Sequence, residues 1–201
     1  MNKILPESFY CPPDVGSLAR SLLGKCLHTK INGQHTAGII VETEAYNGIH
    51  DKACHAYEGR QTKRTESMYA KGGHTYVYLC YGIHSLFNIV SGPEKTPTAI
   101  LIRAIEPVIG IPCMLKRKKL RTLDHRLCSG PGSLTKALGI NTRQDKLSLN
   151  GPLIYVTETE INLNTIDIIS SPRVGVDYAK EDANLPYRFY IKGNKWISRI
   201  K

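Results

Sequence analysis

The sequence lacks the features of exported, disulfide-stapled and membrane proteins. Its six cysteines stand singly, with no C-x-x-C pair, which is typical of reduced thiols in an intracellular protein. No run approaches the 18 apolar residues of a transmembrane helix. Residues 1–13 also lack the continuous apolar stretch of a signal peptide. We therefore expect a soluble protein that is not exported and has no membrane partner.

Paired metal ligands are missing too. Zinc could only gather residues that are distant in the sequence, without the close ligand spacing of zinc sites. The residues available for this are Cys54, His55, Cys80 and His84. The spacing gives a zinc site little support.

Acidic residues are scarce relative to basic ones. The chain has 17 Asp and Glu against 27 Lys and Arg, so its net charge is +10. This balance is typical of proteins that bind nucleic acid or another anionic surface, although many basic enzymes bind neither. With 201 residues, 41% of them hydrophobic, and no repeat, linker or low-complexity tract, we expect one domain over residues 1–201 with a core of its own.

Two acids end an apolar run in the stretch GIIVETEAY, residues 38–46. Side chains alternate across a strand, so Glu42 and Glu44 share one face. A carboxylate on a partly buried strand is costly unless it is paired or has a chemical role. The alternative is a solvent-facing edge with two ordinary surface acids.

Periodicity and turn signals predict a mixture of helices and strands. Asp14 can cap a helix that Gly24 ends, and Asn32-Gly33 is a strong hairpin signal. The expected helices cover residues 14–24, 108–121 and 133–139. The expected strands cover 25–31, 34–46, 76–80, 83–90, 98–105, 153–158 and 166–170, with a closing hairpin of 188–192 and 195–200.

A long irregular segment, residues 47–74, follows the two acids and is more typical of a functional loop than of an idle one. Within it Arg60, Lys63 and Arg64 suit phosphate contacts, or form an ordinary solvated basic loop; the two interpretations are about even. Gly130 and Gly132 precede a helix start, whose free amides favour an anion; the alternative is a plain turn into a helix.

Three further residues carry chemical expectations. Tyr81 lies beside a glycine at a predicted hairpin tip and could wedge between base steps of DNA. Asn88, in an apolar run, must find hydrogen bonds, either from the backbone or from a bound polar ring. Arg103 interrupts an apolar strand, so a carboxylate must meet it; Glu42, Glu44 and Glu106 are the candidates.

These features together predict an enzyme that binds nucleic acid, stacks a base between aromatic rings and uses a carboxylate on water. Two rival hypotheses remain. A metal-dependent nuclease would use Glu42, Glu44, Asp51 and His55 as ligands. A non-catalytic nucleic-acid binder would stack bases on Tyr76, Tyr78 and Tyr81.

The motifs VETEAY, YVYLCYG, LIRAIEP, SGPGSLTKALGI, PRVGV and RFYIKGNKWIS closely resemble the alkyladenine (3-methyladenine) DNA glycosylase family, in register from about residue 8 to residue 198. The resemblance implies a single mixed α/β (α+β) domain, with a curved antiparallel sheet flanked by helices and a β-hairpin for the DNA minor groove. It also implies a monofunctional repair enzyme with no metal or cofactor, expected to act as a monomer on duplex DNA. Its location would be the cytoplasm, at the nucleoid, in a prokaryote and the nucleus in a eukaryote.

The resemblance assigns roles residue by residue. Glu44 is similar to the general base that activates water, Arg103 and the carbonyl of Val174 to groups that hold this water, and Tyr81 to the intercalating residue. Tyr46, His55 and Tyr78 resemble the walls of the base pocket, and Asn88 a residue that selects against guanine; Glu42 matches a motif position without the catalytic role. The implied reaction removes alkylated purines, 3-methyladenine and 7-methylguanine, with hypoxanthine and ethenoadenine as further candidates, and leaves an abasic site.

Overall fold

The structure is a computed structural model that describes residues 3–162 and 165–198. Its helices are α1 (Val15–Ser21), α2 (Ile111–Lys118) and α3 (Pro131–Leu138), joined by short 3-10 turns. Its strands are β1 (Cys26–Ile31), β2 (Gln34–Tyr46), β3 (Thr75–Cys80), β4 (His84–Ser91), β5 (Thr98–Ile109), β6 (Ile154–Thr157), β7 (Ile168–Ser171) and β8 (Arg188–Ile191).

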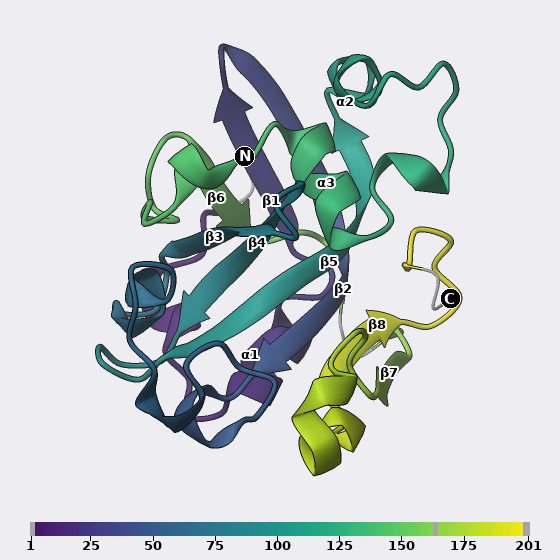
Figure 1. The fold of residues 1–201 in the computed structure, drawn as a ribbon. Helices are drawn as coiled ribbons and strands as arrows, with labels where there is room; N and C mark the ends of the chain where they lie inside the picture. The colour runs from purple at the N-terminus through teal and green to yellow at the C-terminus, as the bar shows by residue number, and fades with distance from the viewer. Residues whose placement is uncertain (1–2, 163–164, 199–201) are drawn as a thin grey trace.

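The described strands join one antiparallel sheet in the order β3-β4-β5-β2-β1-β6, with β8 pairing with both β2 and β7. The long β2 and β5 run through the middle of the molecule, with α2 and α3 near one end and the β7–β8 pair near the other (Figure 1). The expected α+β class with a curved antiparallel sheet is confirmed. Within the described residues, no helix has the length and apolar character needed to cross a membrane.

The sheet bends where β2 and β5 lose their regular register. Ile40 pairs with Ile105 and Glu42 with Ala104, so Val41 is passed over on one strand. The next pair skips Arg103 on the other strand. Such bulges bend a strand and redirect a side chain. The first half of β2 then pairs with β1, and the half that carries the two acids pairs with β8.

Strand alternation gives the sheet two different faces. One face is apolar and packs with the helices in the main core; it includes Ala45, Val77, Phe87, Ile89, Ile100 and Ile102. The alternate residues of the same strands face a cavity; they include Tyr46, Tyr76, Tyr78, Asn88, Leu101 and Arg103. The period of two therefore places core and cavity on opposite sides of one sheet.

Several local predictions are confirmed. The Asp14 carboxylate accepts a hydrogen bond from the Ser17 amide and caps α1. Asn32 and Gly33 both have positive φ, as a type I′ hairpin turn requires. Gly139 ends α3 in the left-handed conformation.

The helix predicted over 108–121 is wrong at both ends. β5 continues to Ile109, because its end still pairs with Ala37 and Gly38 of β2. Gly110 then turns the chain at φ 73°, where a Cβ would lie 2.4 Å from a backbone oxygen, and α2 spans only Ile111–Lys118.

The predicted closing hairpin is also wrong. β8 pairs with β2 and β7, and residues 195–198 form no strand. The Asn194 side chain accepts from the Trp196 amide and donates to Glu106, while the Ser198 amide donates to Glu42. Hydrogen bonds to side chains therefore hold this segment against the sheet, in place of the backbone hydrogen bonds of a strand pair. Residues 199 and 200 lie outside the described residues.

Candidate active site

A cavity of about 830 Å³ lies over the polar face of the sheet, covered by the irregular segment 47–74 and by residues 174–178. It brings together most of the predicted site residues, which are far apart in sequence. The predicted residues that line it are Tyr46, His55, Arg60, Arg64, Tyr78, Tyr81, Asn88, Arg103 and Val174. The volume is in the range of small-molecule sites.

Glu44 lies directly behind the cavity and is fully buried. One carboxylate oxygen accepts a hydrogen bond from the Val174 amide at 2.8 Å. The other accepts from the Tyr46 hydroxyl at 2.9 Å and lies 3.2 Å from the Arg103 guanidinium. All three partners line the cavity, so the carboxylate is oriented by the groups that form the cavity wall. Burial and the Glu44 charge raise the pKa of Tyr46, which keeps its hydroxyl protonated as the donor.

Glu42 has a different environment on the same strand. It is fully buried and accepts from the guanidinium groups of Arg103, at 2.9 Å, and Arg188, at 2.7 Å. It also accepts from the amide and hydroxyl of Ser198, at 2.6 and 2.7 Å. Glu42 therefore meets a backbone amide and two basic side chains. Arg103 forms ion pairs with both Glu42 and Glu44, as its position in an apolar strand predicted. Glu106, the third candidate, accepts a hydrogen bond from Asn194.

A second buried ion pair, between Arg173 and Asp51, lies beside the residues that line the cavity. Both terminal guanidinium nitrogens of Arg173 contact the Asp51 carboxylate, one of them at 2.8 Å, and both side chains are almost fully buried. Arg173 also donates to the carbonyl of Ala45, and its guanidinium lies 4.9 Å over the Tyr46 ring. The pair therefore ties the segment that follows the acids to the segment that carries Val174.

Aromatic rings form the far wall. His55 meets Tyr78 edge-on at 4.7 Å between centroids, and its Nδ1 lies 2.8 Å from the Tyr76 hydroxyl. Burial, with repulsion from Arg64 and Arg60, lowers the pKa of His55 to about 4. The imidazole is therefore neutral at physiological pH and can face a cation without repulsion.

Asn88 is buried in the cavity floor. Its amide nitrogen donates to the carbonyls of Tyr76 at 3.0 Å and Leu86 at 3.4 Å. Both contacts require the NH₂ group, which fixes how the amide is turned. The backbone satisfaction that the sequence offered as one alternative is present, and the side chain still lines the cavity.

Tyr81 stands at the tip of the β3–β4 hairpin. Tyr81 and Gly82 have positive φ, and the Ile83 amide donates to the carbonyl of Cys80, as in a type I′ turn. Tyr81 is 90% exposed and Ile83 is 73% exposed. An apolar tip that lacks partners within the described chain contributes little to folding.

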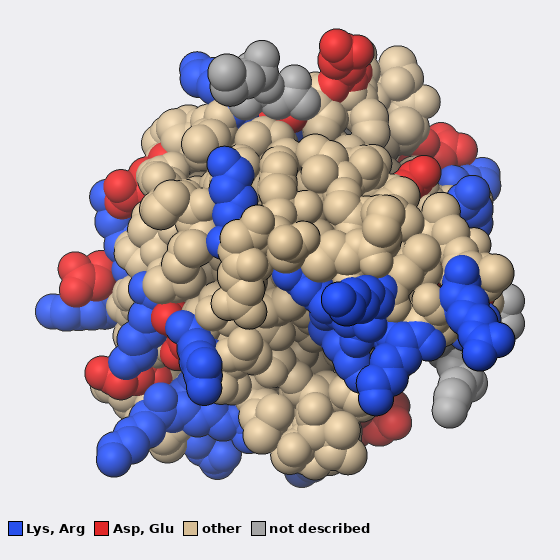
Figure 2. Space-filling model, turned by 90° about the horizontal axis from the view of Figure 1, so that it is seen from above, with Lys and Arg blue, Asp and Glu red and all other residues tan. Residues whose placement is uncertain are grey.

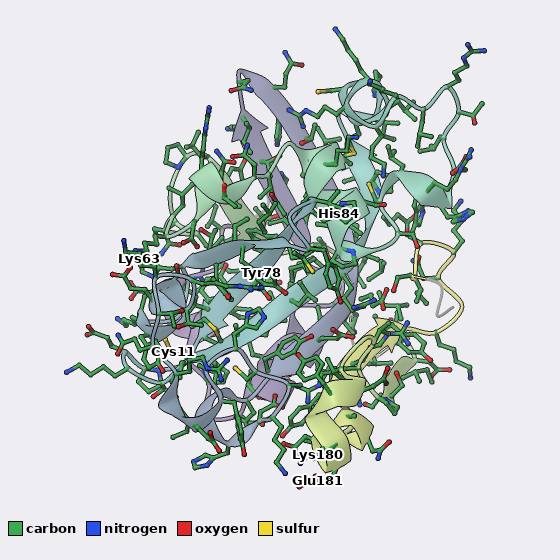
Figure 3. All side chains as sticks on the ribbon, viewed as in Figure 1. Cys11, Lys63, Tyr78, His84, Lys180 and Glu181 are labelled. Atoms are coloured by element: carbon green, nitrogen blue, oxygen red, sulfur yellow. The ribbon has the colours of Figure 1, made fainter. Side chains whose placement is uncertain are left out.

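The predicted phosphate contacts lie around the cavity and not all of them reach it. Lys63 is exposed and stands at the edge of the molecule, while Tyr78 lies near its centre (Figure 3). Gly130 and Gly132 flank Pro131, which does line the cavity. A Cβ on Gly132 would lie 3.0 Å from the His84 ring, so this glycine lets α3 approach the hairpin. Lys and Arg side chains predominate over Asp and Glu on the face that Figure 2 shows.

The described residues contain no group of three or more His, Cys, Asp and Glu side chains that could hold a metal ion. Glu42, Glu44 and Asp51, the acids of the nuclease hypothesis, are each engaged by an arginine. A set of ligands already neutralised in this way suits a structural and positioning role better than a cation site.

Comparisons with known proteins identify the family of the chain. The family model of methylpurine-DNA glycosylase (MPG) matches residues 8–195. A protein of Chlamydia felis is 45% identical over 96% of this chain and 98% of its own length. One from Clostridium acetobutylicum is 43% identical over 92% of each chain. Both are named "putative 3-methyladenine DNA glycosylase".

The chain belongs to the methylpurine-DNA glycosylase family. The resemblance drawn from the motifs is thereby confirmed. Members of this methylpurine-DNA glycosylase family are DNA-repair hydrolases that cleave N-glycosyl bonds, so DNA is the substrate of this chain.

Sequence reasoning missed several residues of this glycosylase site. Arg173 and Arg188 hold Asp51 and Glu42, and Tyr178 lines the cavity mouth with its hydroxyl on the carbonyl of Ala53. A signal was available for the two arginines, because each precedes an apolar residue in a segment that also matches a family motif. Nothing in the sequence around Tyr178 indicates its position.

Proposed function

We propose that this glycosylase flips a methylated purine out of duplex DNA into the cavity and hydrolyses its N-glycosidic bond, leaving an abasic site. The observation that carries the proposal is Glu44, a buried carboxylate oriented by three groups of the cavity wall. A carboxylate at this place can take the proton of a water that attacks C1′. Arg103 and the carbonyl of Val174 would hold this water.

The walls favour a lesion that is already cationic. Tyr46 and Tyr78 offer electron-rich ring faces, and His55 is neutral. A purine alkylated at N3 or N7 is positively charged, so it gains from such faces and leaves without a further proton. The preferred substrates are therefore 3-methyladenine and 7-methylguanine. Hypoxanthine and ethenoadenine are neutral, and their release would also need protonation of the leaving group.

Asn88 supports discrimination against normal purines. Because its amide is fixed by two carbonyl acceptors, it cannot turn to suit any base that enters. A base that carries an exocyclic amine at this place would clash with a side chain that cannot move aside. Normal guanine carries such an amine.

The hairpin and the basic surface would hold the DNA. Tyr81 is exposed at a rigid tip, suited to fill the gap that a flipped nucleotide leaves. Arg60, Lys63 and Arg64, with the amides at Gly130 and Gly132, would contact phosphates. A monomer would suffice for all these contacts, and the enzyme would work where the chromosome lies, at the nucleoid in a prokaryote.

The test is base release from alkylated duplex DNA in the presence of EDTA. We expect free 3-methyladenine and 7-methylguanine, with an intact strand that breaks only after alkaline treatment of the abasic site. A panel that includes hypoxanthine and ethenoadenine defines the lesion range. Strand cleavage without base release would overturn the proposal in favour of a nuclease, and binding without any product would favour a stacking protein.

A further inference from the structure

Arg64 occupies the aromatic end of the cavity. Its guanidinium carbon lies 4.7 Å from the centroid of the Tyr78 ring, and one of its terminal nitrogens lies 3.4 Å from Nε2 of His55. These rings are the ones that the proposed function assigns to the flipped base. Arg64 therefore places a cation on the wall that the proposed function assigns to a cationic base.

Arg64 and a cationic base cannot both lie against this wall without strong electrostatic repulsion. A guanidinium over a tyrosine ring and an alkylpurine over the same ring gain from the same electron-rich surface, and their like charges repel at short range. An entering lesion must therefore displace Arg64, as must any other base.

Arg64 is free to be displaced. It is exposed and lies in the irregular stretch between two 3-10 turns, Tyr57–Gly59 and Glu66–Tyr69. Among the described residues, no carboxylate forms an ion pair with it. A DNA phosphate can offer a guanidinium two parallel charge-assisted hydrogen bonds, which outweigh its contacts with the Tyr78 ring and with Nε2 of His55.

We propose that Arg64 is a placeholder that blocks the base site until a phosphate of the bound DNA draws it away. The inference rests on the proposed function. It makes Arg64 a positioning residue that couples binding of the DNA phosphate backbone to opening of the cavity. A free nucleoside, which carries no phosphate, cannot release the placeholder.

The experiment measures binding of two phosphate-free probes, 7-methylguanosine and guanosine, by calorimetry at pH 6. Arg64→Ala should bind 7-methylguanosine about threefold more tightly than the unmodified protein, with a smaller gain for neutral guanosine. The matched control is Arg60→Ala, which removes an equal charge that also acts on His55. Among the described contacts, Arg60 makes no cation–π contact, so this variant removes the charge alone. It should change 7-methylguanosine binding less than Arg64→Ala does.

Duplex DNA should give the opposite sign. Arg64→Ala should bind lesion DNA more weakly, with a salt dependence reduced by about one phosphate contact. Unchanged or weaker nucleoside binding by Arg64→Ala would overturn the placeholder, as would equal gains in the two variants. If the unmodified protein still releases 3-methyladenine in that case, only this inference fails. If it releases no base, the proposed function fails whatever the nucleosides show.

Discussion

The two faces of the sheet are built from the same strands and follow different rules. On the core face, Val77, Phe87 and Ile100 are held by packing alone and need no partner. On the cavity face, Glu44 and Arg103 are buried charges, and each has a specific partner. The core face tolerates exchange of one apolar residue for another of similar volume, whereas the cavity face requires particular atoms at particular places.

The largest expected effect is on the chemistry of the cavity face. Glu44→Gln keeps the shape of the side chain and removes the carboxylate that we propose as the general base, so excision under single-turnover conditions should fall by about 10²- to 10⁴-fold. Binding of lesion DNA should survive, as an electrophoretic mobility shift would show.

Glu42→Gln is the matched control on the same strand. Its loss leaves Arg103 and Arg188 without a shared buried carboxylate, so the free energy of unfolding should fall by about 3 kcal/mol. Excision per folded molecule should fall much less than in Glu44→Gln. Equal losses of excision would mean that the two acids do not have separate roles.

Phe87→Ala tests the core face. The side chain is fully buried, so urea unfolding should show a loss of about 3–5 kcal/mol. The rate of excision by folded protein at saturating enzyme should stay within a few-fold of the original, because Phe87 does not line the cavity. A large loss of rate at full folding would show that the two faces are coupled.

Tyr81→Ala tests the exposed residue at the tip of the β3–β4 hairpin, at the rim of the cavity. Because Tyr81 is 90% exposed, stability should hardly change, while lesion DNA should bind about tenfold more weakly through lost stacking. Leu123→Ala, at another exposed apolar residue, is the control and should leave binding as it was. Unchanged affinity of Tyr81→Ala would argue against the wedge.

The smallest expected effect is on stability at low pH. Burial, the first cause in each case, lowers the pKa of both His28 and His55 to about 4 in the folded protein, against about 6.5 when unfolded. Falling pH protonates the unfolded chain first, so this stabilisation is full above pH 6.5 and is lost as the pH falls toward 4. His28→Phe keeps an aromatic ring against Tyr155. Between pH 7 and 5 its free energy of unfolding should fall by about 1 kcal/mol less than that of the unmodified protein, a figure reduced to account for solvent screening of the partly exposed His28. Identical urea-unfolding profiles would refute it.

Local patterns predicted the strands, the hairpin turns and the burial of the acids, because alternation and turn chemistry are properties of neighbouring residues. Arg103 was placed with Glu42 and Glu44 because a guanidinium in an apolar strand has few ways to be satisfied. The bulges at Val41 and Arg103 could not be predicted, because they arise from the pairing of two strands that are far apart in the sequence. Glu42 and Arg103, for example, are separated by 61 positions.

Long-range pairings explain the errors as well. Gly193 and Asn194 have the composition of a hairpin turn, but the Asn194 side chain donates a hydrogen bond to Glu106. β8 pairs with β2 and not with the residues that follow the turn. The ion pair between Asp51 and Arg173 spans 122 residues, so the sequence around Arg173 could not indicate which acid it would meet.

This ion pair has a consequence for the order in which the enzyme becomes active during synthesis. Glu44 emerges early from the ribosome, but Arg173 and Val174 follow about 130 residues later, and Arg188 later still. At ribosomal speeds of roughly 5–20 residues per second, the acid waits many seconds for the groups that orient it. A nascent or prematurely ended chain therefore carries the Glu44 carboxylate without the groups that orient it, and on the proposed mechanism it cannot release bases from nearby DNA before the rest of the chain has been made.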